Sequence, residues 1–274
     1  MKKSVEEMKQ VATIIRKDIV KMLTESASGH PGGSLSAVEI LTTLYFNEMN
    51  VTPEKPRDLD RDRFVLSKGH AAPVLYSTLA RRGYFDVEEL KTLRKIGSIL
   101  QGHPNMNDVP GIDMSTGSLG QGISAAVGMA LAGKLDKKDY RVYVLLGDGE
   151  LEEGQVWEAT MSAAHYKLNN LTAFIDYNGL QIDGPIEEVM SAAPIGDKFR
   201  AFNWHVIEID GHSFEQIINA IGEAKTIKDK PTVIVCKTVK GKGVSFMENE
   251  VGWHGNAPSK EQCEKALQEL GGEE

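Results

Sequence analysis

Residues 141–184 read RVYVLLGDGELEEGQVWEATMSAAHYKLNNLTAFIDYNGLQIDG, and this stretch decides the fold. Asp148 follows the apolar run 142–146, and Asn178 follows the run 171–175 about 30 residues later, with a helical pattern between them. This spacing fits one strand, helix and strand unit, whose two strands lie parallel and adjacent. Because open parallel sheets bind ligands at the carboxyl ends of their strands, both oxygen donors are expected to meet at one edge.

The side chains at these two strand ends are suited to Mg²⁺ bound to a diphosphate. Mg²⁺ is usually held by one or two protein oxygens together with phosphate oxygens and water, so Asp148, Asn178 and a loop carbonyl would be sufficient. Gly147 and Gly149 would let the backbone approach the ligand. A second interpretation stays open, because Gly-Asp-Gly is also a good turn sequence and Asn-Gly is a common hairpin signal. The occurrence of both at this spacing favours the metal-diphosphate site.

The hydrophobic pattern of the whole chain alternates between strand and helix periods, without a linker, a low-complexity segment or an internal repeat. It predicts an α/β fold, a parallel sheet with helices on both faces, built by a single domain over residues 1–274. The expected strands are 63–66, 141–146, 171–176, 205–209 and 232–238. The expected helices are 5–23, 37–46, 74–82, 87–96, 121–135, 155–167, 213–228 and 260–270.

The composition fits an enzyme domain of the cytoplasm. With 41% hydrophobic and 26% charged residues, 274 residues can bury a large core. A net charge of −8 argues against nucleic acid as a partner, since such proteins need a basic surface. No apolar run approaches bilayer length, so we expect no membrane association. Cys236 and Cys263 fit neither a disulfide framework nor a zinc motif, which indicates a reducing compartment.

The histidines provide independent evidence for a site. Five of the seven have glycine as an immediate neighbour, which places them on loops: His30, His70, His103, His212 and His254. For a single loop histidine the simpler interpretation is a solvated side chain or one that caps a helix. His212 fits that interpretation, because Ser213 and Gln216 form a plausible capping box beside it. His165 and His205 fall in a predicted helix and at a strand start, and we expect them to be structural.

Gly-Asp-Gly at 147–149, followed by Asn178, resembles the thiamine diphosphate signature of transketolases, pyruvate dehydrogenase E1 components and related enzymes. The resemblance extends from about residue 9 to about residue 270 and is strongest to transketolases. It implies thiamine diphosphate and Mg²⁺ as cofactors, with Ca²⁺ or Mn²⁺ able to substitute. Asp148, Asn178 and the carbonyl of Leu180 would ligate the metal, and Gly149 and Glu150 would lie against the cofactor.

Four histidine segments resemble active-site segments of transketolases. The segment 28–32 matches one whose histidine, here His30, contacts the sugar near its reacting carbons. The segment 63–71 matches one whose histidine, here His70, lies beside the diphosphate. Gly102-His103-Pro104 matches a third active-site histidine, and His254 in Trp253-His254-Gly255 matches one that lies between cofactor and substrate. His30, His103 and His254 are therefore predicted catalytic residues, with His30 and His254 contacting substrate.

The same resemblance assigns two further groups of residues. The loop 115–122 resembles the one that passes under the aminopyrimidine ring of the cofactor, which makes Gly117, Ser118 and Leu119 predicted cofactor contacts. Ser118 stands where transketolases usually have proline. Glu153 and Glu158 match glutamates that meet the partner chain and link two active sites. For both glutamates a solvated acidic turn at a helix start is the simpler alternative.

A full transketolase carries a second domain that embraces the aminopyrimidine ring and a third, smaller domain, and 274 residues hold only the first. The resemblance therefore implies the N-terminal subunit of a split transketolase, a transferase that moves a two-carbon ketol unit from a ketose phosphate to an aldose phosphate. Its partner would be a separately encoded C-terminal subunit, with two copies of each in a heterotetramer. Two alternatives stay open: a related thiamine enzyme acting on another ketose or a 2-oxo acid, and a non-catalytic scaffold half.

Overall fold

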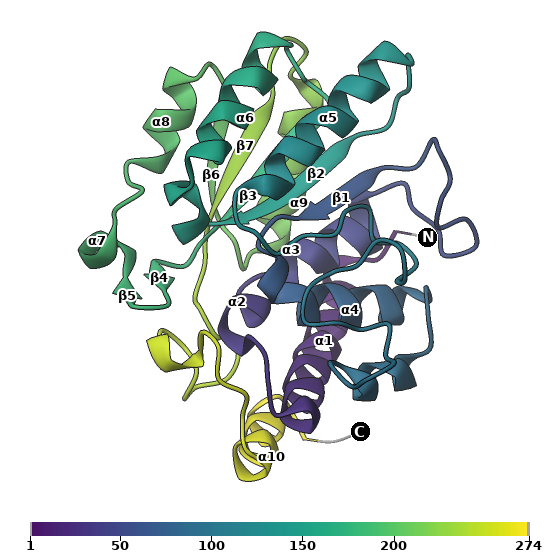
Figure 1. Cartoon of the computed structure of the whole chain (residues 1–274), viewed down its shortest axis with the longest axis vertical. Coiled ribbons are helices and arrows are strands. Elements are labelled where there is room, and N and C mark those ends of the chain that lie inside the picture. The colour runs from purple at the N-terminus through teal and green to yellow at the C-terminus, as the bar shows by residue number, and fades with distance from the viewer. Residues whose placement is uncertain (1, 273–274) are drawn as a thin grey trace.

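The computed structural model describes residues 2–272 and is built around one parallel sheet (Figure 1). The five strands of this sheet lie in the order β1-β2-β3-β7-β6. All four neighbouring pairs are parallel. The strands are β1 (Arg63–Leu66), β2 (Val142–Gly147), β3 (Leu171–Tyr177), β6 (His205–Asp210) and β7 (Thr232–Lys237). A short antiparallel hairpin, β4 (Leu180–Gln181) and β5 (Gly184–Pro185), stands apart from the sheet.

Helices cover both faces of the sheet, which confirms the predicted fold class (Figure 1). The α-helices are α1 (Val5–Ser26), α2 (Pro31–Leu35), α3 (Val38–Thr43), α4 (Ala72–Arg82), α5 (Gln121–Leu135), α6 (Gly154–His165), α7 (Ile186–Val189), α8 (Ile195–Ala201), α9 (Phe214–Thr226) and α10 (Lys260–Glu269). The 3₁₀ helices are η2 (Gly69–Ala71), η3 (Val87–Thr92), η4 (Gly149–Glu152) and η5 (Val251–Trp253), and η1 (Leu44–Glu48) is a π-helix.

Alternation of side chains along the buried strands separates two hydrophobic cores. On β2, Val142, Val144 and Leu146 pack with α5, α6 and α8 on one face of the sheet. Tyr143 and Leu145 point to the other face and pack with α1, α3, α4 and α9. Because successive side chains of a strand point to opposite faces, a strand that is apolar throughout can serve both cores.

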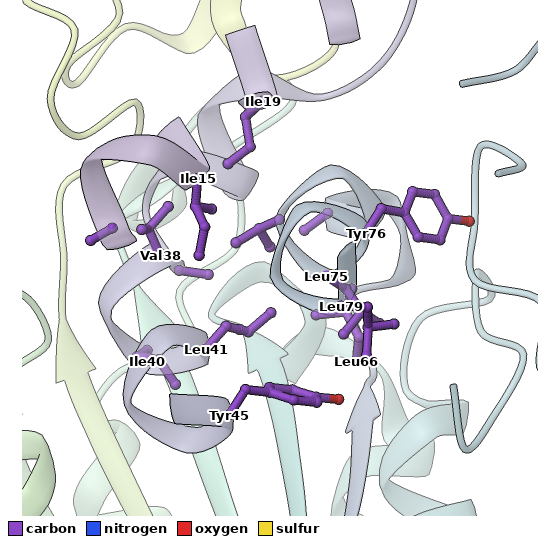
Figure 2. Close-up of a cluster of buried hydrophobic side chains, with 14 of the residues drawn as sticks. Ile15, Ile19, Val38, Ile40, Leu41, Tyr45, Leu66, Leu75, Tyr76 and Leu79 are labelled. Carbon is purple, nitrogen blue, oxygen red and sulfur yellow. The ribbon is translucent and has the colours of Figure 1, made fainter. Parts of the chain in front are cut away.

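The core that contains α1, α3 and α4 is built from aliphatic side chains together with aromatic ones such as Tyr45 and Tyr76, as Figure 2 shows. Leu79 of α4 is fully buried beside Leu66 at the end of β1, and Leu41 of α3 is fully buried in the same cluster. This packing holds the carboxyl end of β1, and with it the following residues 67–70, against the helices. The core therefore positions a loop that the sequence associates with ligand binding.

The predicted strands all form, and most predicted helices form within a few residues of their expected ends. Two helices differ. The expected helix 37–46 begins at Val38 and passes into the π-helix η1 after Thr43. The expected helix 87–96 is the 3₁₀ helix η3, which ends at Thr92 because Arg94 adopts a left-handed φ of 61° and donates its N–H to the Leu100 carbonyl.

Several short elements were not predicted, namely α2, α7, α8 and the β4–β5 hairpin. Each has at most seven residues, too few for a hydrophobic period to repeat often enough to be recognised. No helix among residues 2–272 is both long and apolar enough to cross a membrane. The prediction of one domain over 1–274 also includes residues 1, 273 and 274, which lie outside the described residues.

Replacing Leu41 with alanine should lower the free energy of unfolding by about 2–5 kcal/mol, because the side chain is fully buried and the cavity would not collapse completely. Urea unfolding of the isolated chain measures the change. Leu135→Ala is the control, since Leu135 is 74% exposed and its loss should change the same quantity by no more than about 0.5 kcal/mol. Equal effects of the two variants would contradict the packing described for α3.

Candidate active site

A cavity of about 440 Å³ lies at the carboxyl ends of β1, β2, β3 and β7. It collects residues from segments that are far apart in the sequence, as expected for a parallel sheet. Twelve residues that the sequence singled out line it: His30, His70, Gly117, Leu119, Gly147, Asp148, Gly149, Glu150, Glu153, Asn178, Leu180 and His254. Ser118, His103 and Glu158 are not among its lining residues.

Asp148 and Asn178 do meet at this edge, because β2 and β3 are neighbours in the sheet. Asp148 accepts hydrogen bonds from the N–H groups of Gly149 at 2.8 Å and Gly179 at 2.6 Å, which joins the two loops. Asn178 accepts from the Leu180 N–H at 3.1 Å. Gly179 has a φ of 77°, so the alternative interpretation as a turn also describes the geometry here. The turn and the set of oxygen donors occupy the same residues.

The chemistry of these oxygens fits a hard divalent cation. Burial, followed by the nearby carboxylate of Asp176, raises the pKa of Asp148 from 3.8 to about 6. A cation placed between the Asp148 carboxylate and a bound anion would favour the ionised carboxylate and so counteract the rise in pKa. Among residues 2–272, no group of three or more His, Cys, Asp or Glu side chains is arranged to hold a metal. A cation here would therefore need the amide oxygen of Asn178 and the Leu180 carbonyl besides Asp148.

Two buried lysines, which were not predicted, add positive charge to the cavity. Lys68 follows β1, is 2% exposed and pairs with the fully buried Asp176. Lys240 is also 2% exposed and donates to the Leu180 carbonyl at 2.9 Å and to Nδ1 of His254 at 2.8 Å. Burial lowers the pKa of Lys240 to about 8. A signal was present in the sequence, because each lysine follows a predicted strand that ends at the same edge as Asp148.

Three of the predicted histidines form one cluster. The ring centroids of His30 and His70 are 5.1 Å apart, and His254 lies 5.6 Å from His30 and 5.4 Å from His70. Burial is the main cause that lowers the pKa of His30 to about 4 and of His254 to about 3. Burial also holds the pKa of His70 well below its ordinary value. All three imidazoles are therefore neutral near pH 7.

The hydrogen bonds of the cluster show which ring nitrogens can act on a ligand. Nδ1 of His254 accepts from the Lys240 ammonium, so a neutral His254 carries its proton on Nε2 and can donate it. Nδ1 of His30 is buried and finds no hydrogen-bond partner among the described residues. Each of these two histidines thus has a ring nitrogen available for a hydrogen bond to a ligand.

His103 lies at the rim of the site rather than in the cluster. Its side chain is largely exposed, and a Cβ added at Gly117 would come within 3.1 Å of its ring. Arg94 is a neighbour that was also not predicted. It donates to the Ser28 hydroxyl at 3.1 Å, and its charge helps to lower the pKa values of both His103 and His30. Its unusual left-handed backbone was not visible in the sequence.

Glu150 connects two of the loops that line the cavity. It is 2% exposed and accepts hydrogen bonds from the N–H groups of Gly120 at 2.9 Å and Gly147 at 3.1 Å, and from the Ser67 hydroxyl. The hydrogen-bonding capacity of its carboxylate is thus used by the protein.

Gly122 lets α5 approach the end of β1, because a Cβ there would lie 2.6 Å from the Ser67 Cα.

The other two predicted glutamates and Ser118 are exposed. Glu153 precedes α6 and borders the cavity, whereas Glu158 lies further along α6. Exposed carboxylates near a helix start fit both the simpler alternative and a contact with another chain.

The interpretation of His212 as solvated or helix-capping is wrong. Its side chain is only 14% exposed, and Nδ1 lies 2.9 Å from a carboxylate oxygen of Glu39. Nε2 accepts from the Val239 N–H at 2.9 Å. The predicted capping box is half formed. The Ser213 hydroxyl accepts a hydrogen bond from the Gln216 N–H, but the Gln216 side chain accepts from the N–H of Asp210 instead of that of Ser213.

The two histidines that we expected to be structural lie outside the site. His205 contacts Glu223, and His165 is an exposed residue at the end of α6.

We expect His30 and His254 to stay neutral from about pH 5.5 to 8, because their pKa values of about 4 and about 3 lie below that range. Both pKa values are lower in the folded chain than in the unfolded chain, where the pKa of histidine is about 6.5. The contribution of the two residues to the free energy of unfolding should therefore be complete above about pH 6.5, and it should be lost as the pH falls through 4 and 3. Nitrogen chemical shifts of labelled histidines report the charge of each ring. A midpoint near pH 6.5 for either residue would disprove the expectation.

Comparisons with known proteins identify the family of the chain. A family model described as "Transketolase, thiamine diphosphate binding domain" matches residues 7–274. One of the subunits of the apulose-4-phosphate transketolase of Phocaeicola vulgatus is 48% identical, over 93% of this chain and 90% of that protein. The 6-deoxy-6-sulfo-D-fructose transketolase subunit SqwG of Clostridium sp. (strain MSTE9) is 47% identical, over 96% of both.

Solved structures agree with the sequence comparisons. The transketolase of Campylobacter jejuni superposes with a TM-score of 0.93 at 33% identity, over 99% of this chain. The chain spans only 44% of that transketolase. Together with the match over nearly the whole length, these similarities show that the chain belongs to the transketolase family and has its thiamine diphosphate binding domain.

Proposed function

We propose that this chain is the diphosphate-binding subunit of a transketolase that transfers a two-carbon ketol unit from a ketose phosphate to an aldose phosphate. One observation carries the proposal: the oxygen donors Asp148, Asn178 and Leu180 share one cavity with three clustered, neutral histidines. A site for a metal-bound diphosphate therefore lies directly beside groups that can hydrogen-bond to a sugar. A non-catalytic scaffold would need neither.

The proposal assigns roles to most of the polar residues of the cavity. Asp148, Asn178 and the Leu180 carbonyl hold Mg²⁺, while the buried Lys68 and Lys240 offset the remaining charge of the diphosphate. Thiamine diphosphate, when bound, supplies the nucleophilic carbon that attacks the ketose. The loop with Gly117, Ser118 and Leu119 supports its aminopyrimidine ring, with Gly149 and Glu150 lining the diphosphate side. Hydrogen bonds support this placement, because the Glu150 carboxylate accepts from the N–H of Gly120, beside this loop, and from the N–H of Gly147, beside Asp148.

The histidines act by hydrogen bonding rather than by carrying charge. His30 and His254 donate to oxygens of the sugar as negative charge develops there, and His70 contacts the diphosphate. His103 takes part from the rim of the site. A neutral imidazole can donate from one nitrogen without adding a second positive charge next to Lys240, which is bonded to His254. This arrangement suits a reaction in which charge appears and disappears on the substrate.

The proposed enzyme needs a second, C-terminal subunit, with two copies of each chain. The two relatives of similar length are both named as subunits, and the single-chain transketolase structure is more than twice as long. The outer sides of α5 and α6 carry exposed apolar side chains, since Leu135 is 74% and Met161 57% exposed. These helices lie side by side on one face of the sheet (Figure 1). We assign this surface to the partner, with Glu153 and Glu158 at its border.

Residues 1–274 form one domain of this assembly, and we place the enzyme in the cytoplasm. A second candidate function differs only in the sugar. The names of the two relatives specify apulose 4-phosphate and 6-deoxy-6-sulfo-D-fructose, so a ketose other than a pentose phosphate is a specific alternative. A panel of ketose donors offered to the assembled enzyme distinguishes the two.

Replacing Asp148 with alanine should weaken Mg²⁺-dependent binding of thiamine diphosphate by several kcal/mol, because the diphosphate would lose its bridge to the protein. Calorimetry on the enzyme assembled with its partner measures the affinity with and without Mg²⁺. The control is Asp113→Asn, which alters another buried carboxylate that pairs with Arg61. Unchanged affinity in the Asp148 variant would rule out its role as a metal ligand.

The isolated chain should self-associate or bind cofactor weakly, and it should transfer no ketol unit, because half of the cleft is supplied by the partner. Addition of the C-terminal subunit should restore transfer that depends on both Mg²⁺ and thiamine diphosphate. A coupled assay with pentose phosphates measures the rate, and mass spectrometry verifies the purity of each chain. Strong activity of the pure isolated chain would overturn the two-subunit proposal.

A further inference from the structure

Lys240 reaches the cofactor site from the segment that follows β7, and the backbone on both sides of it is held from outside the cavity. Nε2 of His212 accepts the N–H of Val239, the residue before Lys240. Nε of Arg16 donates to the carbonyl of Lys242 at 2.9 Å, two residues after it. The lysine side chain therefore projects from a short stretch of backbone that is fixed at each end.

Both of these contacts lead to a single carboxylate. Glu39 of α3 is 6% exposed and accepts from Arg16 at 2.6 Å through Oε1. Its second oxygen, Oε2, lies 2.9 Å from Nδ1 of His212. One buried side chain thus orients two of the groups that hold the segment 239–242, which is also bonded through its backbone to Gly32 and Asn249. Neither Glu39, Arg16 nor His212 lines the cavity about Lys240.

The hydrogen bonds also define the proton on His212. Because Nε2 accepts from a backbone N–H, it carries no proton, and the proton of the neutral ring must sit on Nδ1. Nδ1–H then donates to Glu39. The carboxylate fixes the tautomer and the orientation of the imidazole, as carboxylates do for histidines that bind metals. Without Glu39 the ring could turn over and present a donor to the Val239 N–H.

We propose that Glu39 is a positioning residue, which acts through His212 and Arg16 to hold Lys240 against the Leu180 carbonyl and His254. The proposal rests on thiamine diphosphate and metal binding at this cavity. Glu39 itself touches neither ligand nor reacting atoms. Its carboxylate adds to the backbone hydrogen bonds that hold the segment after β7, so that the ammonium of Lys240 is already in place when an anion binds.

Chemical labelling of the metal-free chain tests the geometry without any cofactor. Glu39→Gln should make Lys240 react several-fold faster with acetic anhydride, measured by mass spectrometry, while Lys68 stays protected. Lys68 is an internal control, because it is buried to the same 2% exposed fraction but pairs with Asp176. Equal gains at both lysines would show general loosening of the fold and overturn the proposal, as would no gain at Lys240.

A matched carboxylate separates positioning from general stability. Asp18 is 8% exposed and pairs with Arg81 at 2.7 Å, but its partners lie on α4. Asp18→Asn should leave Lys240 protected even if it lowers the melting temperature as much as Glu39→Gln does. If Glu39→Gln does not fold, His212→Leu removes one of the two contacts and should give the same selective labelling of Lys240, whereas protection equal to the wild type would overturn the proposal.

A double-mutant cycle in the assembled enzyme tests the consequence for binding. Glu39→Gln and Lys240→Met should each weaken thiamine diphosphate binding about tenfold, the scale of outer contacts at metal sites. The double variant should bind no more weakly than Lys240→Met alone, because Glu39 acts only through Lys240. Independent, multiplying effects would overturn the proposal. Failure of the wild type to bind thiamine diphosphate would instead refute the proposed function, while the labelling experiment would still decide the role of Glu39.

Discussion

The buried carboxylate of Asp176 joins the parts of this molecule that form the site. It is completely inaccessible on β3 and accepts hydrogen bonds from Lys68 after β1, from Thr238 after β7, and from Ser36 at 2.5 Å. A buried carboxylate is costly unless it is paired and fully hydrogen-bonded, and here each bond fixes a different segment. Burial and, after it, the same charge raise the pKa of Asp148, so the network that builds the edge also prepares it for a cation.

The cavity carries its positive charge on lysines and leaves its histidines neutral. Lys68 and Lys240 are buried and held by Asp176 and by Leu180 with His254, respectively. Their charge, added to burial, disfavours protonation of the imidazoles around them. In the proposed function, attraction for an anion and hydrogen bonding to a sugar would therefore be carried by different side chains, so either property could change without the other.

Sequence patterns predicted the sheet and the convergence of Asp148 with Asn178, because strand periodicity and the length of a strand, helix and strand unit are local signals. The cluster of His30, His70 and His254 was suggested by glycine neighbours and by family resemblance, and their roles remain predictions. Lys240 and the Glu39–His212 contact were missed, since Glu39 and His212 are 173 residues apart and no local pattern links them. Pairings of that kind depend on tertiary packing.

Gly122 shows how little freedom the start of α5 has. The atom that a Cβ would strike, the Cα of Ser67 at 2.6 Å, belongs to the backbone and cannot move aside as a side chain would. Any other amino acid would push α5 away from β1, and with it the loop that Glu150 joins to Gly147. A saturation library at this position should retain glycine alone, so attempts to alter substrate choice by directed evolution must leave this codon unchanged and draw their variation from the rim.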